Sequence, residues 1–426
     1  MTAAEDKFRH YDILTGARAG GYTGGVKLKS DEVFWPQLSD ETGDRFEQLS
    51  GDRACDVAIV GGGITGALAA YHFIRAGVST LLIDCRQPGH GSTAASTGLL
   101  QYEIDTSLVE LAGLIGRDNA SAAYRASVEA VKAFEPLVAE IGDNCGLIRR
   151  HSAYLASRGP DVDDLRLESE ARRSIGIDVE YLDHSAVRER CNLSRPAALW
   201  SSCAYEVDPF RLCRSLIRWS AKRGLEVAGE SEIVGRETRA QGVTLKTSYG
   251  ARIKARKVVV ATGYETTPEI PRGLFKLLST YAMVSDPIPG FQAWPGQFLI
   301  WESARPYLYL RTTADNRIIV GGEDVDLVDP QKRDAMVPAK ARQLGDRFAG
   351  LFPEIDIQCS CAWGGTFAQT QDGLPYIGTL AQFPHAYFAL GYGGNGITFS
   401  LLAARIIVAA FLGSADKDAH LFRFDR

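Results

Sequence analysis

The hydrophobic and polar positions of the chain predict a strand, a turn, a helix and a second strand near residue 60. Asp56 to Val60 (DVAIV) is a short apolar run typical of a buried strand, and from Ala67 the apolar residues recur at helical spacing. The segment GGGITG, Gly61 to Gly66, separates the two. A second apolar run, Ser79 to Ile83, ends at Asp84. This order of elements is typical of a βαβ unit.

The glycine turn has the spacing of a dinucleotide-binding site. Gly61 permits the tight turn, Gly63 lets the backbone approach a pyrophosphate, and Gly66 lets the helix pack close to the strand. Asp84 lies 23 positions after Gly61, where such a unit carries the acid that accepts hydrogen bonds from the ribose hydroxyls. We therefore expect a bound adenine dinucleotide. A glycine-rich structural turn without a ligand is the alternative.

Small and hydroxyl-bearing residues fill the next segment, Gly89 to Asp105. It has too few large apolar residues to form core on its own, so a flexible loop is the plain interpretation. Its position directly after the ribose-binding acid favours another one. Ser92 to Gly98 can place backbone N–H groups and hydroxyls on the pyrophosphate and ribityl chain of the ligand.

A second glycine pattern, Gly391 to Gly396 (GYGGNG), follows a predicted strand and precedes a helix. A second dinucleotide unit, as in a nicotinamide-linked reductase, needs another strand ending in an acid about 20 residues further on, and a polar tail up to Arg426 stands there instead. We favour a helix N-terminus aimed at a ligand. If the ligand is a flavin, the N–H groups near Asn395 to Thr398 would stabilise negative charge at its N1–C2 edge.

The rest of the pattern predicts a helical segment and a second sheet. Ser107 to about Ser194 has mainly helical spacing with charged faces, which favours a cap of exposed helices. Asp208 and Pro209 have the residue types of an N-cap and a first helical position. The apolar strand KVVVATG, Lys257 to Gly263, is expected to complete the nucleotide-binding sheet. Strands of a second sheet, on the substrate side, are predicted at Tyr281 to Asp286, Gln297 to Trp301, Tyr307 to Thr312 and Arg317 to Gly321.

Composition narrows the class of protein. A chain of 426 residues with 45% hydrophobic and 23% charged residues is typical of a soluble globular protein of about two or three domains. The net charge of −5 gives no overall positive charge that would attract nucleic acid. Eight scattered cysteines without a CxxC pair predict free thiols rather than disulfides or a zinc site. No signal-peptide core and no apolar run of roughly 20 residues is present, so we expect a cytoplasmic protein without a membrane span.

Five segments in order, GGGITG, GSTAAST, VVVATG, WGGTFAQTQDGLPYIG and GYGGNGI, resemble those of the D-amino-acid-oxidase-like flavoprotein superfamily. The pairing of WGG with GYGGNG is most similar to the gamma-glutamylputrescine oxidoreductase branch. The resemblance implies FAD, a discontinuous Rossmann-like domain and a sheet-based substrate domain. It also implies oxidation of a C–N bond of an amine or amino-acid derivative, with hydride transfer to flavin N5 and hydrolysis of the imine.

Several positions depart from the patterns of this superfamily. Two arginines that hold the substrate carboxylate in glycine-oxidase-like members fall on Phe367 and Gly394, and the lysine of sarcosine oxidases falls on Ile319. These departures argue against a small α-amino acid held by those anchors, and they leave oxidase versus dehydrogenase open. The histidine that carries covalent flavin in dimethylglycine-dehydrogenase-like members matches Ala95, so we expect noncovalent FAD.

The expected fold class is α/β (α+β overall), with a Rossmann-like FAD-binding domain that is discontinuous in sequence and a second domain built on a mixed or antiparallel sheet. The expected segments are an N-terminal extension at 1–50, anchored by Phe34 and Trp35; FAD-binding segments at 51–106, 199–278 and 362–426; a helical cap and substrate-side segment at 107–198; and a substrate-domain sheet at 279–361. The residues expected to contact FAD are Gly61, Gly63, Ile64, Thr65, Gly66, Asp84, Cys85, Gly91, Ser92, Thr93, Ala95, Ser96, Thr97, Gly98, Leu99, Val234, Ala261, Thr262, Gly263, Gly365, Gly393, Gly394, Asn395, Gly396, Ile397 and Thr398.

Four residues are candidates for substrate contact. Tyr309 and Arg311 lie two apart in LYLRTT and share one face of a predicted strand, so Arg311 could hold a carboxylate and Tyr309 an amine or carbonyl. An arginine that supports the sheet edge is an equally weighted alternative. Tyr281 could line the pocket wall. Glu103, just after the small-residue loop, could attract a cationic amine, although a solvated glutamate is the plainer account, and no catalytic base is assigned.

The sequence therefore favours an FAD-dependent oxidoreductase acting on a small-molecule amine or amino acid, with O2, a quinone or a carrier protein as electron acceptor and with no nucleic-acid partner. Two alternatives stay open. One is a flavin-binding assembly or scaffold protein without turnover, and the other is a dehydrogenase subunit that passes electrons to a partner. A metal site is not expected.

Overall fold

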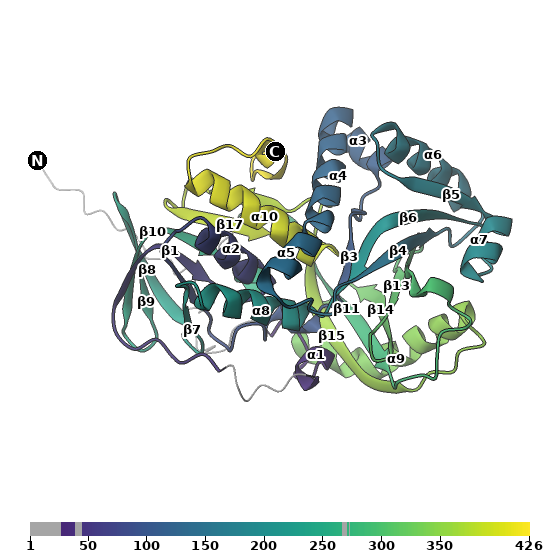
Figure 1. Ribbon diagram of the computed structural model, residues 1–426, viewed down its shortest axis with the longest axis horizontal. Helices are drawn as coiled ribbons and strands as arrows, with labels where there is room; N and C mark the ends of the chain where they lie inside the picture. The colour runs from purple at the N-terminus through teal and green to yellow at the C-terminus, as the bar shows by residue number, and fades with distance from the viewer. Residues whose placement is uncertain (1–26, 39–44, 266–270, 272) are drawn as a thin grey trace, which may run out of the picture.

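The computed structural model describes residues 27–38, 45–265, 271 and 273–426, which fold around two large sheets. In Figure 1 the elements of one sheet lie at the left and those of the other at the right, with helices between and around them. The expected α/β fold class with two sheet-based parts is confirmed. The expected extension at residues 1–50 falls largely outside the described residues, as do positions 266–270 and 272 of an expected FAD-binding segment.

The first sheet has a core of parallel strands, as the predicted βαβ unit requires. Its order is β16-β17-β10-β1-β2-β7, and a hairpin of β8 and β9 continues from β10. Its strands are β1 (Arg53–Val60), β2 (Thr80–Ile83), β7 (Glu226–Ala228), β8 (Ile233–Arg239), β9 (Gly242–Thr247), β10 (Arg252–Val260), β16 (Tyr376–Gly378) and β17 (Ala386–Leu390). Because these strands come from distant parts of the chain, the sheet is discontinuous in sequence.

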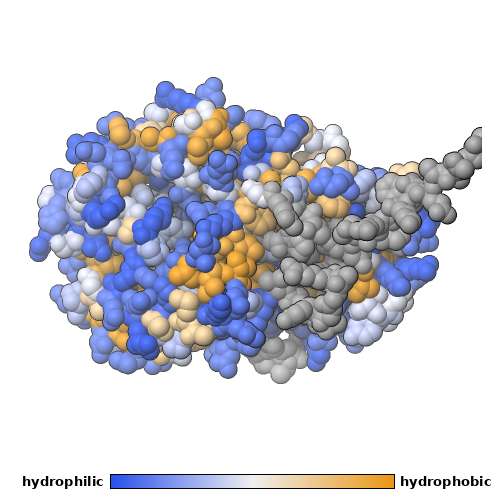
Figure 2. All heavy atoms as spheres, turned by 180° about the vertical axis from the view of Figure 1, so that it is seen from behind, coloured by the Kyte–Doolittle hydropathy of each residue, from blue (hydrophilic) through white to orange (hydrophobic). Residues whose placement is uncertain are grey.

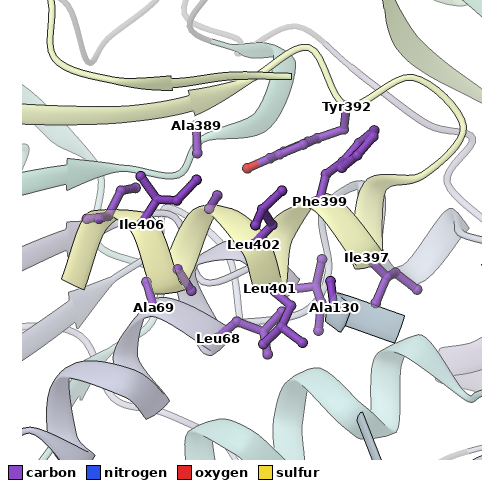
Figure 3. Packing of buried hydrophobic residues seen from close by; sticks show 14 of the residues in the cluster. Leu68, Ala69, Ala130, Ala389, Tyr392, Ile397, Phe399, Leu401, Leu402 and Ile406 are labelled. Carbon is purple, nitrogen blue, oxygen red and sulfur yellow. The ribbon is translucent and has the colours of Figure 1, made fainter. Parts of the chain in front are cut away.

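Beside the first sheet, helix α2 (Ile64–Arg75) packs against both α8 (Pro209–Ala221) and α10 (Gly396–Phe411). Figure 3 shows Leu401 of α10 pointing toward Leu68 of α2, while Leu402 and Ile406 point to the other side, toward Tyr392 and Ala389. This apolar packing fixes the direction of α10 and therefore the place of its N-terminus. The predicted start of α8 is confirmed, since the Asp208 side chain accepts a hydrogen bond from the backbone N–H of Arg211 at 2.9 Å.

The second sheet is mainly antiparallel, in the order β15-β11-β14-β13-β12-β4-β6-β3, with β5 paired to β6. The long helix α9 (Pro330–Leu351) packs against β11, β14 and β15. The strands are β3 (Leu99–Gln101), β4 (Ile148–Leu155), β5 (Val179–Asp183), β6 (Ala197–Glu206), β11 (Phe275–Ser285), β12 (Leu299–Glu302), β13 (Leu308–Thr312), β14 (Ile318–Val325) and β15 (Cys359–Thr370). The four strands predicted after residue 280 correspond to β11, β12, β13 and β14.

The segment predicted to be mainly helical, residues 107–194, contains helices but also contributes β4 and β5 to the second sheet. β4 has the sequence IRRHSAYL, in which the first half is polar and partly exposed, so its apolar pattern is weak. The helices are α3 (Leu108–Ile115), α4 (Arg117–Lys132), α5 (Phe134–Ile141), α6 (Asp161–Ser174) and α7 (His184–Cys191). The part of the chain that the structure describes has no helix long and apolar enough to cross a membrane.

The described part of the N-terminal extension packs onto the body through α1 (Phe34–Gln37). Phe34 and Trp35 are the predicted anchors, and both are buried, in a cluster with Trp363 and Ile319. All eight cysteines are free thiols, as expected. Figure 2 shows hydrophilic residues over much of the face opposite to that of Figure 1, with apolar residues gathered near its middle.

Candidate cofactor and active site

A single cavity of about 810 Å³ runs from the glycine turn of the first sheet to the inner face of the second sheet. Its volume lies in the upper part of the range of about 300–1,000 Å³ that is usual for small-molecule and cofactor sites. The strand ends of the first sheet, the small-residue loop and the start of α10 line one part. Residues of β11, β12, β13, β14 and β15 line much of the rest.

The glycine turn lies at one end of this cavity, and its geometry requires glycine. Gly61 has a φ of +104°, and a Cβ there would lie 2.4 Å from the carbonyl oxygen of Ala261. A Cβ on Gly66 would lie 1.9 Å from the carbonyl oxygen of Gly61, so no side chain fits between strand and helix. The turn leads directly into α2, whose first N–H groups have no intrahelical acceptor. Such a helix start binds phosphate.

Asp84 lines the same end of the cavity. Its carboxylate accepts hydrogen bonds from the backbone N–H of Gly62 at 2.6 Å and of Arg86 at 2.7 Å. Burial raises the pKa of Asp84, and these two hydrogen bonds oppose the rise. The acid therefore holds the glycine turn in place, and it lies where ribose hydroxyls would reach it.

The small-residue loop, Gly91 to Leu99, is held from behind by two buried indoles. Trp35 Nε1 donates to the carbonyl oxygen of Ser96 at 2.6 Å, and Trp363 Nε1 donates to that of Ala95 at 2.8 Å. The two tryptophans come from the N-terminal segment and from β15, so residues far apart in the sequence fix the loop against the cavity.

Arg311 holds the next part of the loop. Its guanidinium is buried and donates to the carbonyl oxygens of Gly98 at 2.8 Å, Thr97 at 3.2 Å, Val207 at 2.7 Å and Thr312 at 2.8 Å. Arg311 does not line the cavity. The structure thus corrects the expectation that it reaches the substrate, because its donors are directed at backbone carbonyls that support the loop.

Several polar side-chain atoms of residues that line the cavity lack a hydrogen-bond partner among the described residues, and two of them are serine and threonine hydroxyls. Ser92 Oγ and Thr262 Oγ1 are buried without a hydrogen bond, and both residues line the cavity. Buried hydroxyls normally have a partner. Together with the glycine cradle, these open groups fit a polar, phosphate-bearing cofactor.

The start of α10 faces the cavity with its backbone rather than with a capping side chain. Asn395 Nδ2 donates to the carbonyl oxygens of Glu103 at 2.7 Å and Gln101 at 3.2 Å. Thr398 Oγ1 also donates to the Gln101 carbonyl oxygen, at 3.2 Å. The Asn395 side chain therefore does not cap the helix. The first N–H groups of α10 stay available to a ligand.

The structure brings nearly all of the expected FAD contacts together. Of those residues, all except Gly66, Gly98 and Thr398 line the cavity. Gly66 and Gly98 act one layer behind it. A Cβ on Gly66 would strike the glycine turn, and a Cβ on Gly98 would lie 2.3 Å from the Val207 carbonyl oxygen. Thr398 instead ties α10 to β3.

Two of the four substrate candidates line the cavity, Glu103 and Tyr309. Tyr309 lies against Gly321, where a Cβ would come within 2.2 Å of its ring, and burial raises the pKa of its hydroxyl. Tyr281 does not line the cavity. It alternates with Thr280, which does, and its hydroxyl lies 3.6 Å from Met336 Sδ of α9. The expectation that Tyr281 forms the pocket wall is therefore wrong, since it points to the opposite face of β11.

The residues that line the part of the cavity next to the second sheet and were not predicted to contact substrate include Asp105, Trp301, Tyr307 and Asp324. The hydroxyl of Tyr307 donates to Asp105 Oδ1 at 3.2 Å, and the backbone N–H of Gly394 donates to Asp105 Oδ2 at 3.0 Å. The spacing of these residues in the sequence contains no signal, because they come from four separate parts of the chain: after β3, on β12, just before β13 and on β14.

Comparisons with known proteins agree with this geometry. The family described as "DAO: FAD dependent oxidoreductase" matches residues 56–410. The chain is 24% identical over 388 residues to gamma-glutamylputrescine oxidoreductase of Escherichia coli (strain K12), covering 87% of each. It is 22% identical over 385 residues to the probable oxidoreductase OrdL of Haemophilus influenzae, covering 88% of this chain and 86% of that protein. The crystal structure of glycine oxidase from Geobacillus kaustophilus has a TM-score of 0.72 with 21% identity, covering 86% of this chain and 96% of that one.

A discontinuous nucleotide-binding sheet facing an antiparallel sheet across one cavity defines a class of flavin enzymes. The family match spans most of the chain, and this protein belongs to the DAO family of FAD-dependent oxidoreductases. The predicted resemblance and the predicted cofactor are confirmed. The glycine turn, Asp84, the loop from Gly91 to Leu99 and the start of α10 are the residues that would hold FAD.

Proposed function

We propose that this enzyme oxidises a C–N bond of an amine. The observation that carries the proposal is the Glu103 carboxylate. It lines the cavity on the segment that Asn395 holds against the start of α10, and its Oε2 atom has no hydrogen-bond partner among the described residues. A carboxylate accepts hydrogen bonds only, so the group that it suits is a donor such as an amine.

When bound, FAD supplies the acceptor for hydride from the carbon next to the amine nitrogen, and the imine product hydrolyses in water. The work of the chain is to position the amine and to take up its proton. Burial raises the pKa of Glu103, so this group accepts a proton more readily than a solvated glutamate does. Arg172, whose Nη1 lies 4.0 Å from Glu103 Oε1, opposes that rise and keeps the carboxylate ionisable.

Two relatives support this reaction class by name. Gamma-glutamylputrescine oxidoreductase and glycine oxidase are named for compounds that contain an amine, and each covers more than four-fifths of this chain. Phe367 and Gly394, which stand where glycine-oxidase-like members have arginines, both line the cavity. Phe367 offers no cation to a substrate carboxylate, and Gly394 offers only its backbone, which donates to Asp105. An amine without a neighbouring carboxylate therefore fits better than an α-amino acid.

The test is anaerobic mixing of the FAD-loaded enzyme with a panel of amines and amino acids. We expect bleaching of the visible flavin band by at least one amine, and release of the corresponding aldehyde or ketone together with ammonia or a smaller amine. If no compound bleaches the flavin, the enzyme interpretation fails and a flavin-binding scaffold without turnover is the better account. Bleaching by NAD(P)H would instead indicate a nicotinamide-linked reductase.

Re-oxidation of the bleached enzyme separates the possible acceptors. Rapid re-oxidation in air with formation of hydrogen peroxide identifies an oxidase. Slow re-oxidation in air that becomes rapid with a quinone or an electron-carrier protein identifies a dehydrogenase, which can be a subunit that passes electrons to a partner.

Glu103→Gln tests the role of the carboxylate. We expect slower flavin reduction and loss of the acid limb of the pH profile, with FAD content unchanged, because glutamine cannot accept a proton. Glu110→Gln, an exposed position on α3, is the matched control. Unchanged pH dependence in Glu103→Gln would remove Glu103 from the proposed mechanism.

A further inference from the structure

Three carboxylates line the part of the cavity next to the second sheet: Glu103, Asp105 and Asp324, called the acidic end below. Among the described residues that line the cavity, Arg86 is the one basic residue, and it neighbours Asp84 at the nucleotide end. The acidic end is therefore not neutralised by a cation of the cavity wall.

Glu103 is the most buried member of the acidic end, with 4% of its surface exposed. Its Oε1 atom accepts a hydrogen bond from Ser152 Oγ at 2.9 Å. The nearest cation, Arg172, is shared with Glu168, to which its Nε donates at 2.7 Å. Oε2 is buried without a partner. A buried carboxylate oxygen without a donor calls for one from a ligand.

Asp324, on β14, presents the second open acceptor. Its Oδ1 atom is buried and has no hydrogen-bond partner in the part of the chain that the structure describes. Burial raises the pKa of Asp324 to about 6, a hydrogen bond with the Thr280 side chain opposes the rise, and the charge of Asp105 adds to it. Arg305 opposes it, but this arginine is exposed and its guanidinium lies over the ring of Tyr307, 4.6 Å from the centroid. Glu323, also nearby, adds further negative charge.

The two open acceptors belong to different sides of the cavity. Glu103 is tied to the start of α10 through Asn395, among the FAD-binding residues, whereas Asp324 belongs to the second sheet. Asp105 connects the two sides, because its carboxylate accepts hydrogen bonds from the backbone N–H of Gly394, beside α10, and from the hydroxyl of Tyr307, just before β13. One small ammonium group near the flavin would satisfy Glu103 and leave Asp324 open.

A cationic group is the ligand chemistry that suits Asp324. An ammonium group has three donors and a positive charge, and a charge-assisted hydrogen bond to a carboxylate is stronger than a neutral one. The rings of Tyr307 and Trp301 line the same part of the cavity and can add cation–π attraction. Trp301 Nε1, which is buried without a partner among the described residues, is a neutral donor and cannot balance the negative charge of the carboxylates. A carboxylate at this place would be repelled by Asp105 and Asp324 together.

We propose that the substrate is a diamine or polyamine, with the amine to be oxidised at Glu103 and a second ammonium group at Asp324. This inference rests on the proposed amine oxidation and deepens it, because it names the substrate class. It assigns Asp324, with Asp105 and Tyr307, a role in substrate selection that is separate from the binding of FAD.

The test compares compounds that differ only at the end remote from the reacting amine. The FAD-loaded enzyme is mixed anaerobically with 1,3-diaminopropane, 1,4-diaminobutane or 1,6-diaminohexane. Each diamine is paired with the monoamine of equal size, butylamine, pentylamine or heptylamine, and with the ω-amino acid of the same chain length. We expect at least one diamine to exceed its monoamine by at least about tenfold in the rate of flavin reduction divided by Kd, with the amino acid slowest.

A charge-neutral variant identifies the residue responsible. In Asp324→Asn the ratio of diamine to monoamine should fall to about one. Asp326→Asn, an exposed position two residues further along that pairs with Lys276, is the matched control and should keep the wild-type ratio. Equal ratios in wild type and Asp324→Asn, or a wild-type ratio of about one for every pair, would overturn the inference.

A binding measurement separates this inference from the proposed function. Kd is measured from the change in the flavin spectrum, or in the melting temperature of the FAD-loaded enzyme, on adding each compound. If no compound reduces the flavin but the diamines bind more tightly than the monoamines in an Asp324-dependent way, amine oxidation fails and the diamine site stands. If monoamines reduce the flavin as well as diamines do, amine oxidation stands and the diamine site fails.

Discussion

Replacement of Arg311 by methionine separates a loop-supporting arginine from a substrate-binding one. The guanidinium is 2% exposed and donates to four backbone carbonyl oxygens at 2.7–3.2 Å, and its Nε lies 3.9 Å from the fully buried Glu206. Methionine fills a similar volume but supplies no donor. The variant therefore removes a donor from four backbone carbonyl groups at the FAD-binding loop, although the Gly98 carbonyl oxygen keeps the N–H of Val207 at 3.0 Å.

The size of the effect follows from these contacts. Each hydrogen bond from a charged donor contributes about 1.5–3 kcal/mol, but the four cannot be added, because burying the guanidinium has itself a large desolvation cost. Removing one partner of a buried charged group costs about 3–5 kcal/mol, and we expect a loss in this range for the free energy of unfolding. Glu206 keeps a second cation, Arg150, at 3.0 Å, which limits the loss.

The assays are urea unfolding of the FAD-free protein and the Kd for FAD, measured by the fluorescence of released flavin. We expect a lower urea midpoint and at least about tenfold weaker FAD binding in Arg311→Met, because the loop loses its support. Arg311→Lys keeps the charge but has fewer donors, so its urea midpoint and its Kd for FAD should lie between those of Arg311→Met and wild type. A variant with a free energy of unfolding within about 1 kcal/mol of wild type and with an unchanged Kd for FAD would refute this reasoning.

Three further predictions address the cofactor turn, the loop and the acidic end. Gly66→Ala should abolish FAD binding and the accumulation of folded protein, since its Cβ would lie 1.9 Å from a backbone carbonyl oxygen. The control Gly113→Ala, with no heavy atom within 4 Å of the added Cβ, should fold normally. Normal folding of both variants would contradict the close approach of helix and strand at Gly66. Trp35→Phe keeps an aromatic side chain but loses the 2.6 Å hydrogen bond to the loop and part of the buried indole volume. We expect a loss of at least about 1–3 kcal/mol in urea unfolding and weaker FAD binding by equilibrium dialysis. Wild-type values in both measurements would show that Trp35 does not support the loop. The folded pKa of Asp324, about 6, lies above its value in the unfolded chain, so the ionised group lowers stability above pH 6 and this cost fades as the pH falls toward about 4. The rate advantage of diamines over monoamines should shrink over the same pH range, because protonated Asp324 carries no charge. A ratio of diamine to monoamine rate that stays constant between pH 6 and about 4 would exclude Asp324 as the selecting group.

The parts of the site that depend on local sequence could be predicted. The turn from Gly61 to Gly66, the acid at Asp84 and the helix start at Asp208 depend on residues close together in the chain, whose chemistry is sufficient to specify them. The start of α10 was also predicted, because a glycine segment stands between an apolar strand and an apolar helix.

The parts that depend on pairing between distant strands could not be predicted. Tyr309 and Arg311 were expected to contact substrate together from one face of a strand. Their positions along β13 differ in what they meet: Tyr309 lines the cavity, whereas Arg311 donates to the carbonyl oxygen of Gly98 in the loop. Asp324 has no local motif and reaches the acidic end through the pairing of β14 with β11, which places Val325 opposite Ser279 and Gly322 opposite Tyr281. Likewise, the support of the loop by Trp35 joins residues 61 positions apart.

The most direct test of the account is a single anaerobic turnover. The FAD-loaded enzyme is mixed with each diamine and its matched monoamine, and the visible flavin band is followed with time. The account predicts that the band is bleached, that at least one diamine bleaches it at least about tenfold more efficiently than its monoamine, and that an aminoaldehyde or its cyclised product is formed in equal amount to the reduced flavin. A flavin band that no amine changes, in enzyme fully loaded with FAD, would contradict the central claim.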